Sequence, residues 1–322
     1  MIRPALALIA LFGLAAPAHA EPSYPQSTIR IVLGFGPGSA PDVAARILAD
    51  QFTAAWGKPV VVENMLGAGG NIAAGHVAKA APDGSTLLMA GNAAIVINPS
   101  LYAKLPYDPA HDLVPVAQVT VAPNILVVSK DVPAANVPEL VELARRSPTP
   151  LTFASAGVGT STHLAGELFQ TMTGIKMQHV PYRDSATLLS DLTAGRVTMF
   201  FGSIASVLPQ VRDGNLRALA ITSLRRSPAA PDIPTLDELG FRGFEATAWF
   251  GLMAPAGTPP AVIAQLHEEA QKAVTAPAAR QKFAALGMET VTRTPSEFAE
   301  QIRTETPKWA ELIKRVGIAP IQ

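Results

Sequence analysis

The chain of 322 residues contains no cysteine. This absence excludes disulfide bonds, thiol nucleophiles and thiolate metal sites, so the fold must be stabilised by a large apolar core. Hydrophobic residues make up 48% of the chain, which is enough to build such a core. The length is typical of two domains, at ~100 to 200 residues each.

An excess of either charge is also missing. The chain has 25 Lys and Arg residues and 25 Asp and Glu residues, and residues 1–20 contain one arginine and no acid. Without that segment 24 basic residues face 25 acidic ones, a net charge of −1. Nucleic-acid binding depends on a basic surface. We therefore expect no nucleic-acid partner.

Motifs for catalysis and metal binding are lacking too. No His-Glu-x-x-His or similar spacing occurs among the histidines, and no serine has the Gly-x-Ser-x-Gly surroundings of a nucleophile elbow. His163 with Ser155 or Ser161 could imitate a nucleophile and its base, although a histidine that caps a helix is the simpler interpretation. We therefore expect no catalytic residue, no metal and no cofactor.

The N-terminus is the one place with a long apolar run. Arg3 precedes apolar residues from Ala5 to Ala16, and Ala18-His19-Ala20 has the small-x-small pattern of a cleavage site. The run is shorter than the ~20 residues that span a bilayer. We predict that residues 1–20 are a cleaved signal peptide and that the mature protein is exported to the periplasm.

Apolar runs alternate with amphipathic segments along the rest of the chain. Strands are expected near 29–33, 60–63, 86–89, 125–129, 151–154, 176–180, 197–201 and 216–222, and helices near 42–56, 138–146 and 162–173. This βα rhythm predicts an α/β fold with mostly parallel sheets flanked by helices. In such sheets ligands bind beyond the carboxyl ends of the strands.

Two strand-to-helix junctions, at 31–42 and 152–163, are rich in glycine and lie where a ligand is expected. Glycine lets a ligand approach the main chain, and the free N–H groups and dipole of a helix N-terminus attract carboxylates or phosphates. Ser39, Thr160, Ser161 and Thr162 can add hydroxyl donors. The alternative is that both junctions are ordinary turns. Ser39 to Asp42 also fits a capping box at the start of the first helix.

A nucleotide site is a second possibility for the first junction, because Gly34-x-Gly36-x-Gly38 follows a strand and Glu63 ends the next one. The spacing differs from the dinucleotide fingerprint, since Ser39 lies close behind Gly38 and Pro37 removes a backbone donor. A nucleotide-dependent oxidoreductase is therefore a weaker hypothesis than the binding of a carboxylate.

These residues resemble the periplasmic solute receptors of the tripartite tricarboxylate transporters, the Bug family, over essentially the whole mature chain. The segments that carry the resemblance are 31–46, 61–64 with 67–71, 78–84, 97–102 with 105–109, 155–167, 180–183, 216–220, 233–236 and 249–259.

The resemblance implies a two-domain periplasmic binding protein of type II, with the ligand in the interdomain cleft. Domain 1 would comprise residues 21–124 plus 249–322 and domain 2 residues 125–248, with crossings near 122–126 and 246–250. Such a receptor closes on a small organic acid and delivers it to the permease subunits of a membrane transporter, and we expect it to be a monomer. A secreted α/β enzyme acting on a small carboxylic acid is the alternative.

The resemblance also implies a set of ligand-binding residues. They are Phe35, Gly36, Pro37, Gly38, Ser39, Ala40, Asp42, Gly69, Asn92, Ser155, Gly157, Gly159, Thr160, Ser161, Thr162, His163, Tyr182 and Gly202. Trp249 and Phe250 are expected either in the core or in the ligand wall.

Departures from the family pattern bear on the ligand. Gly34 stands where proline is common, Met65 replaces an arginine and Asp184 replaces a glycine. Gly202 stands where an aspartate can meet the ammonium group of an amino acid. These differences predict a mono- or dicarboxylate without an amino group, which can be aromatic.

Overall fold

The computed structural model describes residues 24–182 and 184–321. The predicted signal peptide and Arg183 lie outside the described residues. The elements follow one another as β1 (Ile29–Leu33), α1 (Ala40–Trp56), β2 (Val60–Asn64), a 3₁₀ turn (Ala68–Gly70), α2 (Asn71–Val77), β3 (Thr86–Gly91), a π-helical turn (Ala93–Ile97), α3 (Asn98–Leu101), β4 (Leu113–Ala122), β5 (Asn124–Ser129), α4 (Val137–Arg146), β6 (Leu151–Ser155), α5 (Ser161–Thr173), β7 (Met177–Pro181), α6 (Ser185–Thr193), β8 (Met199–Ser203), α7 (Ile204–Arg212), β9 (Leu216–Ile221), β10 (Ala248–Pro255), α8 (Pro260–Thr275), α9 (Pro277–Ala285), β11 (Glu289–Thr290) and α10 (Pro295–Val316).

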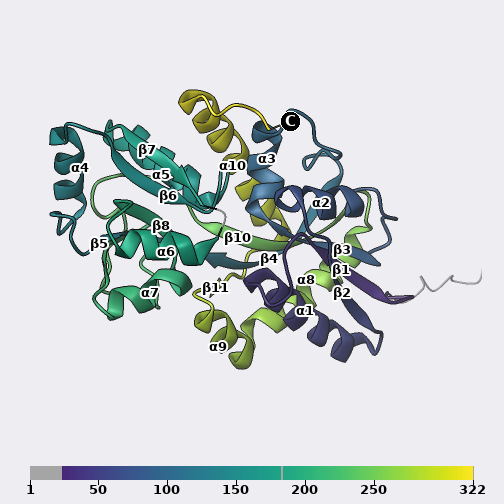
Figure 1. The fold of residues 1–322 in the computed structure, drawn as a ribbon. Helices are drawn as coiled ribbons and strands as arrows, with labels where there is room; N and C mark the ends of the chain where they lie inside the picture. Colours follow the sequence, from purple (N-terminus) through teal and green to yellow (C-terminus); the bar gives the residue numbers. More distant parts are fainter. Residues whose placement is uncertain (1–23, 183, 322) are drawn as a thin grey trace, which may run out of the picture.

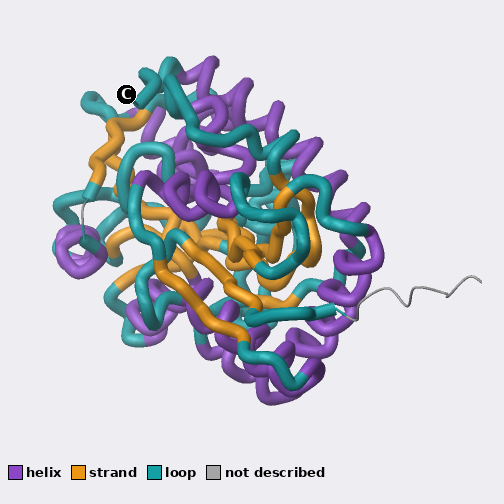
Figure 2. The backbone as a smooth tube through the Cα atoms, turned by 90° about the vertical axis from the view of Figure 1, so that its right-hand side faces the viewer, coloured by secondary structure: helices purple, strands orange, loops and turns teal. Residues whose placement is uncertain are grey.

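Two sheets form the centre of the molecule, and helices cover both of them (Figures 1 and 2). Strands β1 to β4, β10 and β11 make the six-stranded sheet, and β5 to β9 make the five-stranded sheet. The expected α/β class with two helix-flanked sheets is confirmed. Across residues 24–182 and 184–321 no helix has the length and apolar character needed to cross a bilayer.

The six-stranded sheet has the order β11-β4-β10-β3-β1-β2. On one face α1, α8 and α9 bury an apolar layer that includes Leu48, Phe52 and Leu266, and on the other face α2 and α10 pack around Val77, Phe298 and related side chains. Helix α1 contributes the stripe Ala44, Leu48 and Phe52, each fully buried, which is the spacing of one helix face.

The five-stranded sheet has the order β7-β6-β8-β5-β9. Helices α4 and α5 cover one face, where Phe153, Phe169 and Phe201 are buried, and α6 and α7 cover the other around Leu192 and Val207. The core on the α5 face is continuous with the core under α2 and α10. On this side of the molecule the two sheets therefore share one apolar layer.

The expectation of mostly parallel sheets is wrong. Only β1 with β2, β1 with β3, β6 with β7 and β6 with β8 pair in parallel, whereas β10 is antiparallel to β3 and β4, β11 to β4, and β5 to β8 and β9. Parallel neighbours need a crossover connection, usually a helix. The antiparallel strands β5 and β10 each enter from the other sheet without such a helix: β5 follows β4 after Pro123 alone, and β10 follows residues 222–247.

The chain changes sheet between Ala122 and Asn124 and again between Ile221 and Ala248. Buried hydrogen bonds hold these two passages together: the Asn124 N–H donates to Thr222 Oγ1 at 2.9 Å, and Asn124 Nδ2 donates to the Ala246 carbonyl at 3.2 Å. The domain limits drawn from the sequence stay a prediction.

Gly34, at the end of β1, lies against the backbone of Gly70, just before α2. A Cβ on Gly34 would overlap the Cα of Gly70. Backbone atoms cannot move aside as a flexible side chain can, so the chain after β1 approaches the glycine-rich segment 67–71 this closely only while position 34 has no side chain. This contact explains why glycine stands at position 34 in this chain.

We predict that Gly34→Ala lowers the free energy of unfolding by about 1 to 3 kcal/mol, because the added methyl group forces the two backbones apart. Gly36→Ala is the matched control, since a Cβ there would have no neighbour within 4 Å among the residues that the structure describes. Urea unfolding of both variants measures the difference. Equal stabilities would contradict the packing described at Gly34.

Candidate functional site

The first glycine junction contains the first loop, residues 35–42, which is organised by the carboxylate of Asp42. This side chain lies in the first turn of α1 and is almost fully buried. Asp42 Oδ2 accepts hydrogen bonds from the Gly38 N–H and Arg46 Nε, both at 2.9 Å. Oδ1 accepts from Asn64 Nδ2 at 2.9 Å and from Arg46 Nη2 at 3.1 Å. Asp42 therefore holds the loop rather than offering itself to a ligand.

Burial opposes ionisation of Asp42, but the hydrogen bonds from Arg46, Asn64 and Gly38 outweigh it and keep its pKa below the usual value. Asn64 ends β2 and also donates to the Phe35 carbonyl at 2.8 Å. The side-chain amide of Asn64 thus connects β2 to both ends of the first loop, at Phe35 and at Asp42.

The predicted capping box at Ser39 is wrong. Ser39 is the N-cap of α1, but its side chain makes no capping hydrogen bond, and its buried Oγ has no partner among the described residues. The Asp42 carboxylate takes the Gly38 N–H instead, so the reciprocal pattern cannot form. The backbone N–H groups of Ala40 and Asp42 find no acceptor in the described chain. Two N–H groups and one hydroxyl are therefore unused at this helix N-terminus.

Phe35 and Phe250 form an aromatic pair beside this loop. Their ring centroids lie 5.5 Å apart in an edge-to-face arrangement, and both rings are partly exposed. Trp249 is instead fully buried against Phe298, with its Nε1 donating to Glu305 Oε2 at 2.9 Å. Of the two expected aromatic residues, Trp249 lies in the core and Phe250 lies at the loop.

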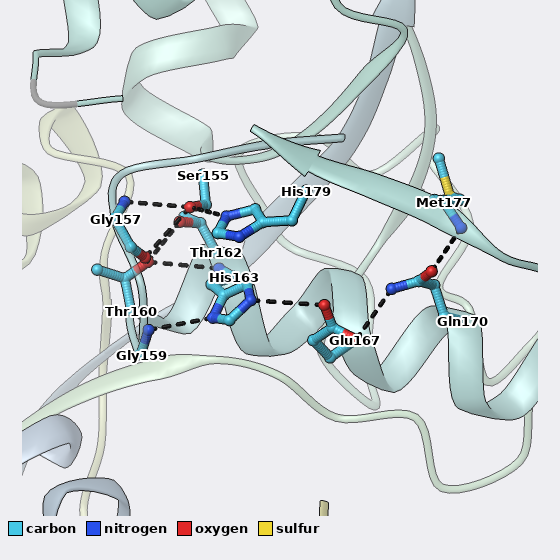
Figure 3. Close-up of polar contacts among 10 residues, drawn as sticks. All are labelled: Ser155, Gly157, Gly159, Thr160, Thr162, His163, Glu167, Gln170, Met177 and His179. Atoms are coloured by element: carbon cyan, nitrogen blue, oxygen red, sulfur yellow. Dashed lines mark hydrogen bonds and ion pairs between the residues drawn. The ribbon is translucent and has the colours of Figure 1, made fainter. Parts of the chain in front are cut away.

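The second glycine junction contains the second loop, residues 155–163, whose shape is held by its own hydroxyl groups (Figure 3). Ser155 Oγ accepts from the Gly157 N–H at 3.1 Å, and Thr162 Oγ1 accepts from the Ala156 N–H at 3.0 Å. Thr160 Oγ1 donates to the Gly157 carbonyl at 2.7 Å and accepts from the His163 N–H. These three hydroxyls are engaged within the loop, so they fix its shape and do not serve as free donors.

His163 also stabilises the second loop through a hydrogen bond to its backbone. It is 3% exposed, and its Nδ1 accepts the Gly159 N–H at 3.1 Å, while its Nε2 lies 3.4 Å from Glu167 Oε1 (Figure 3). Its ring stacks on that of His179, with centroids 3.9 Å apart. His179 Nε2 in turn lies 2.6 Å from Ser155 Oγ. The serine therefore pairs with His179 and not with His163.

The remaining donors of the second loop point to a binding surface made of backbone. The N–H groups of Val158, Ser161 and Thr162 have no acceptor among the described residues. Ser161 is also the one loop hydroxyl without a hydrogen-bond partner in this part of the chain. The N-terminus of α5 thus resembles that of α1, with several donors left free.

Helix α3 contacts both the glycine-rich segment 67–71 and the second glycine junction. A Cβ on Gly69 would come within 3.3 Å of Asn98 Nδ2, and a Cβ on Gly159 would overlap Leu101. Asn92, just after β3, is buried and donates to the Thr247 carbonyl at 3.1 Å. No hydrogen bond within the described chain joins the first loop directly to the second.

Tyr182 and Gly202 lie at the carboxyl ends of β7 and β8. The Tyr182 hydroxyl donates to Asp191 Oδ2 at 2.8 Å, and burial together with this carboxylate raises its pKa. A Cβ on Gly202 would overlap Val207 and lie 2.6 Å from Phe200 Cε1. The space that a side chain at position 202 would need is filled by these two neighbours.

Four surface cavities have volumes between 270 and 760 Å³, and none of the four is lined by a predicted ligand-binding residue. One of them, of about 720 Å³, lies between α7 and the segment of α9 and β11, with Arg212, Arg280 and Met288 in its walls. This α7–α9 groove is a second place where a ligand could lie.

Comparison with known proteins identifies the family. The sequence pattern described as "Tripartite tricarboxylate transporter family receptor" matches residues 44–318. The chain belongs to this receptor family. The receptor is 38% identical to Protein BugT of Bordetella pertussis over 317 residues, which cover 97% of each chain.

Solved structures agree with this membership. The R. palustris protein Rpa4515, solved with adipate, is 33% identical to the receptor with a TM-score of 0.77, covering 93% of this chain and 100% of that one. MatC from Rhodopseudomonas palustris, with bound malate, is 31% identical with a TM-score of 0.74, covering 90% and 100%. The resemblance to the Bug family, the periplasmic-binding-protein fold and the function of a solute-binding receptor are confirmed.

Several residues of the receptor were missed by sequence reasoning. Asn64 and Arg46 hold the first loop, and His179 and Glu167 support the second. In the parallel register of β6 and β7, His179 lies beside Phe153, and Phe153 precedes Ser155 by two residues. A single sequence does not reveal this register, although alternation along β7 could have indicated that Met177 and His179 share a face.

We predict that acid destabilises the fold through His179. Burial and the adjacent His163 lower its pKa to about 4, whereas an unfolded chain has a histidine pKa near ~6.5. Between these values the unfolded chain binds a proton that the folded chain does not, so the free energy of unfolding falls as pH drops from 6.5 towards 4. Urea unfolding at several pH values measures this slope.

His179→Phe keeps a ring for stacking and removes the titration, so its slope should be shallower. His76→Phe, which changes an exposed histidine of α2, controls for the loss of an imidazole elsewhere. An unchanged slope in His179→Phe would show that other groups cause the acid sensitivity.

Proposed function

We propose that this receptor captures a small organic carboxylate between the first and second loops and does not chemically transform it. The observation that carries the proposal is that, among residues 24–182 and 184–321, no acceptor meets the backbone N–H groups at the two helix N-termini, at Ala40 and Asp42 and at Val158, Ser161 and Thr162. Such groups, with the helix dipole behind them, bind an anionic oxygen. The candidate residues named from the sequence remain the proposed ligand contacts or supports of these contacts.

A ligand without an amino group is favoured by the surroundings of Gly202. No carboxylate stands at this position to meet an ammonium group, and Val207 and Phe200 fill the space. The related proteins solved with adipate and with malate hold dicarboxylates that have no amino group. We extend this ligand class to the present chain. The edge-to-face pair of Phe35 and Phe250 beside the first loop also favours an aromatic acid as one possible member of the class.

The alternative of a secreted enzyme is disfavoured by the state of Ser155. Its Oγ lies 2.6 Å from His179 Nε2, as in a nucleophile with its base, but Ser155 is fully buried and its Oγ is also bonded to Gly157. A nucleophile must reach the reacting carbon. Incubation with candidate acids followed by NMR of the solution tests for turnover.

The same proposal includes the context of the receptor. Residues 1–20 would be removed on export to the periplasm, and the monomeric receptor would deliver its ligand to permease subunits of a tripartite transporter. Residues 21–124 plus 249–322 would form one lobe and residues 125–248 the other. Ligand binding would favour a closed arrangement of the two lobes, because only there can one anion meet both loops.

We predict that replacing a hydroxyl or hydrogen of the ligand by an ammonium group weakens binding at least about tenfold, since a buried ammonium group would lack a partner near Gly202. Malate against aspartate, and adipate against 2-aminoadipate, are matched pairs. Isothermal titration calorimetry measures the four dissociation constants. Tighter binding of both amino acids would overturn the proposed ligand class.

We also predict that Ser39→Trp abolishes binding, because an indole at the N-cap of α1 covers the free N–H groups of Ala40 and Asp42. Ala284→Trp is the matched control, since it places the same side chain in the α7–α9 groove. Thermal unfolding checks that both variants are folded. Loss of binding in Ala284→Trp with normal binding in Ser39→Trp would place the ligand in that groove instead.

A further inference from the structure

A chain of polar contacts runs from the second loop to β7 (Figure 3). The Gly159 N–H donates to His163 Nδ1, and His163 Nε2 faces Glu167 Oε1 at 3.4 Å. Gln170 Nε2 donates to Glu167 Oε2 at 2.9 Å, and Gln170 Oε1 accepts the Met177 N–H at 2.6 Å. Glu167 and Gln170 belong to α5, so the helix that begins at the loop also carries its support.

The direction of the first bond fixes the protonation of His163. A backbone N–H can only donate, so Nδ1 must be without a proton, and the neutral ring carries its proton on Nε2. That proton faces the Glu167 carboxylate. If the proton moved to Nδ1, it would meet the Gly159 N–H, and the glycine would have to turn away. Since Gly159 also packs directly against Leu101, such a movement would disturb the loop next to α3.

His179 fixes the other side of the loop. Its Nε2 lies 2.6 Å from Ser155 Oγ, which accepts the Gly157 N–H. The charged or titratable groups that face the two stacked rings are Glu167 from α5 and the rings themselves, His163 from α5 and His179 from β7. Phe153 of β6 closes the stack with an apolar ring. Burial, and the His163 ring against which an added proton would lie, lower the pKa of His179.

We propose that Glu167 and His179 are positioning residues of the ligand site: Glu167 holds His163 as the Nε2–H tautomer, and His179 holds Ser155 on Gly157. Together they occupy the N–H groups of Gly157 and Gly159 and leave those of Val158, Ser161 and Thr162 for the carboxylate. This inference rests on the proposed function, because it concerns the donors that the ligand would use. Neither side chain needs to touch the ligand for this role.

The first measurement uses the wild-type protein with ¹⁵N-labelled histidine and no ligand. Long-range ¹H–¹⁵N spectra distinguish the two tautomers of a neutral imidazole. We expect the His163 signals of an Nε2–H tautomer with an unprotonated Nδ1. Signals of an Nδ1–H tautomer at His163 would overturn the inference, whether or not a carboxylate binds.

The second measurement compares variants of Glu167. Glu167→Leu removes the carboxylate that faces the His163 Nε2–H at 3.4 Å, so we expect a mixture of tautomers and a dissociation constant for adipate or malate that rises about tenfold. Glu167→Gln keeps an acceptor oxygen at this position and should stay within about threefold of wild type, as expected for a change that retains the polar contact. If Glu167 only stabilised the fold, Glu167→Leu would not change the tautomer of His163, and Glu167→Gln would not restore the affinity.

Controls separate the possible failures. Glu142→Leu removes an exposed carboxylate from α4 and should leave both the tautomer and the affinity unchanged. His179→Phe should weaken binding while His163 keeps its tautomer. If wild type binds a carboxylate and Glu167→Leu changes neither the tautomer nor the affinity, the inference is wrong. If no carboxylate binds but the tautomer shifts in Glu167→Leu as expected, the proposed function fails and the role of Glu167 in the loop stands.

Discussion

The first loop depends on the buried carboxylate of Asp42, whose two oxygens accept four hydrogen bonds. A buried carboxylate is costly unless it is fully paired. The pairing therefore fixes the loop through Gly38, the neighbouring strand through Asn64 and the next helical turn through Arg46. Because the acceptor positions of Asp42 are filled in this way, the N–H groups of Ala40 and Asp42, at the N-terminus of α1, have no acceptor among the described residues and stay available to a ligand.

In the second loop, neutral side chains rather than a carboxylate form the hydrogen bonds that hold the backbone. Ser155, Thr160, Thr162 and His163 take up backbone groups of the loop itself, and free N–H groups remain at the start of α5. The two halves of the proposed site thus differ in their chemistry: the first is held by an ion pair and an amide, the second by hydroxyls and imidazoles. In both, side chains decide which backbone donors are left for an anion.

Much of the fold could be predicted from the sequence, because strands such as 29–33 and helices such as 42–56 carry clear apolar periodicity. The glycine spacing likewise located both loops. The antiparallel strands were missed since local sequence does not encode the direction in which β5 and β10 enter their sheets. The sequence also did not show that Asp42 and the loop hydroxyls form hydrogen bonds within their own loops. Residue type indicates a donor or acceptor, but only the folded geometry shows whether a ligand or the protein itself uses it.

The place of β10 has a consequence for the order in which the chain can fold. This strand is formed by residues 248–255 and pairs with both β3 and β4, which do not pair with each other. Until those residues are available, β1 to β3 form a partial sheet with an open edge, and β4 lacks its main neighbour. Such pairing across a long stretch of sequence is slow to form. Strands β3 and β4 are therefore joined only after about four fifths of the chain has been synthesised, and β11 completes the sheet later still, so the N-terminal strands form an incomplete sheet until then.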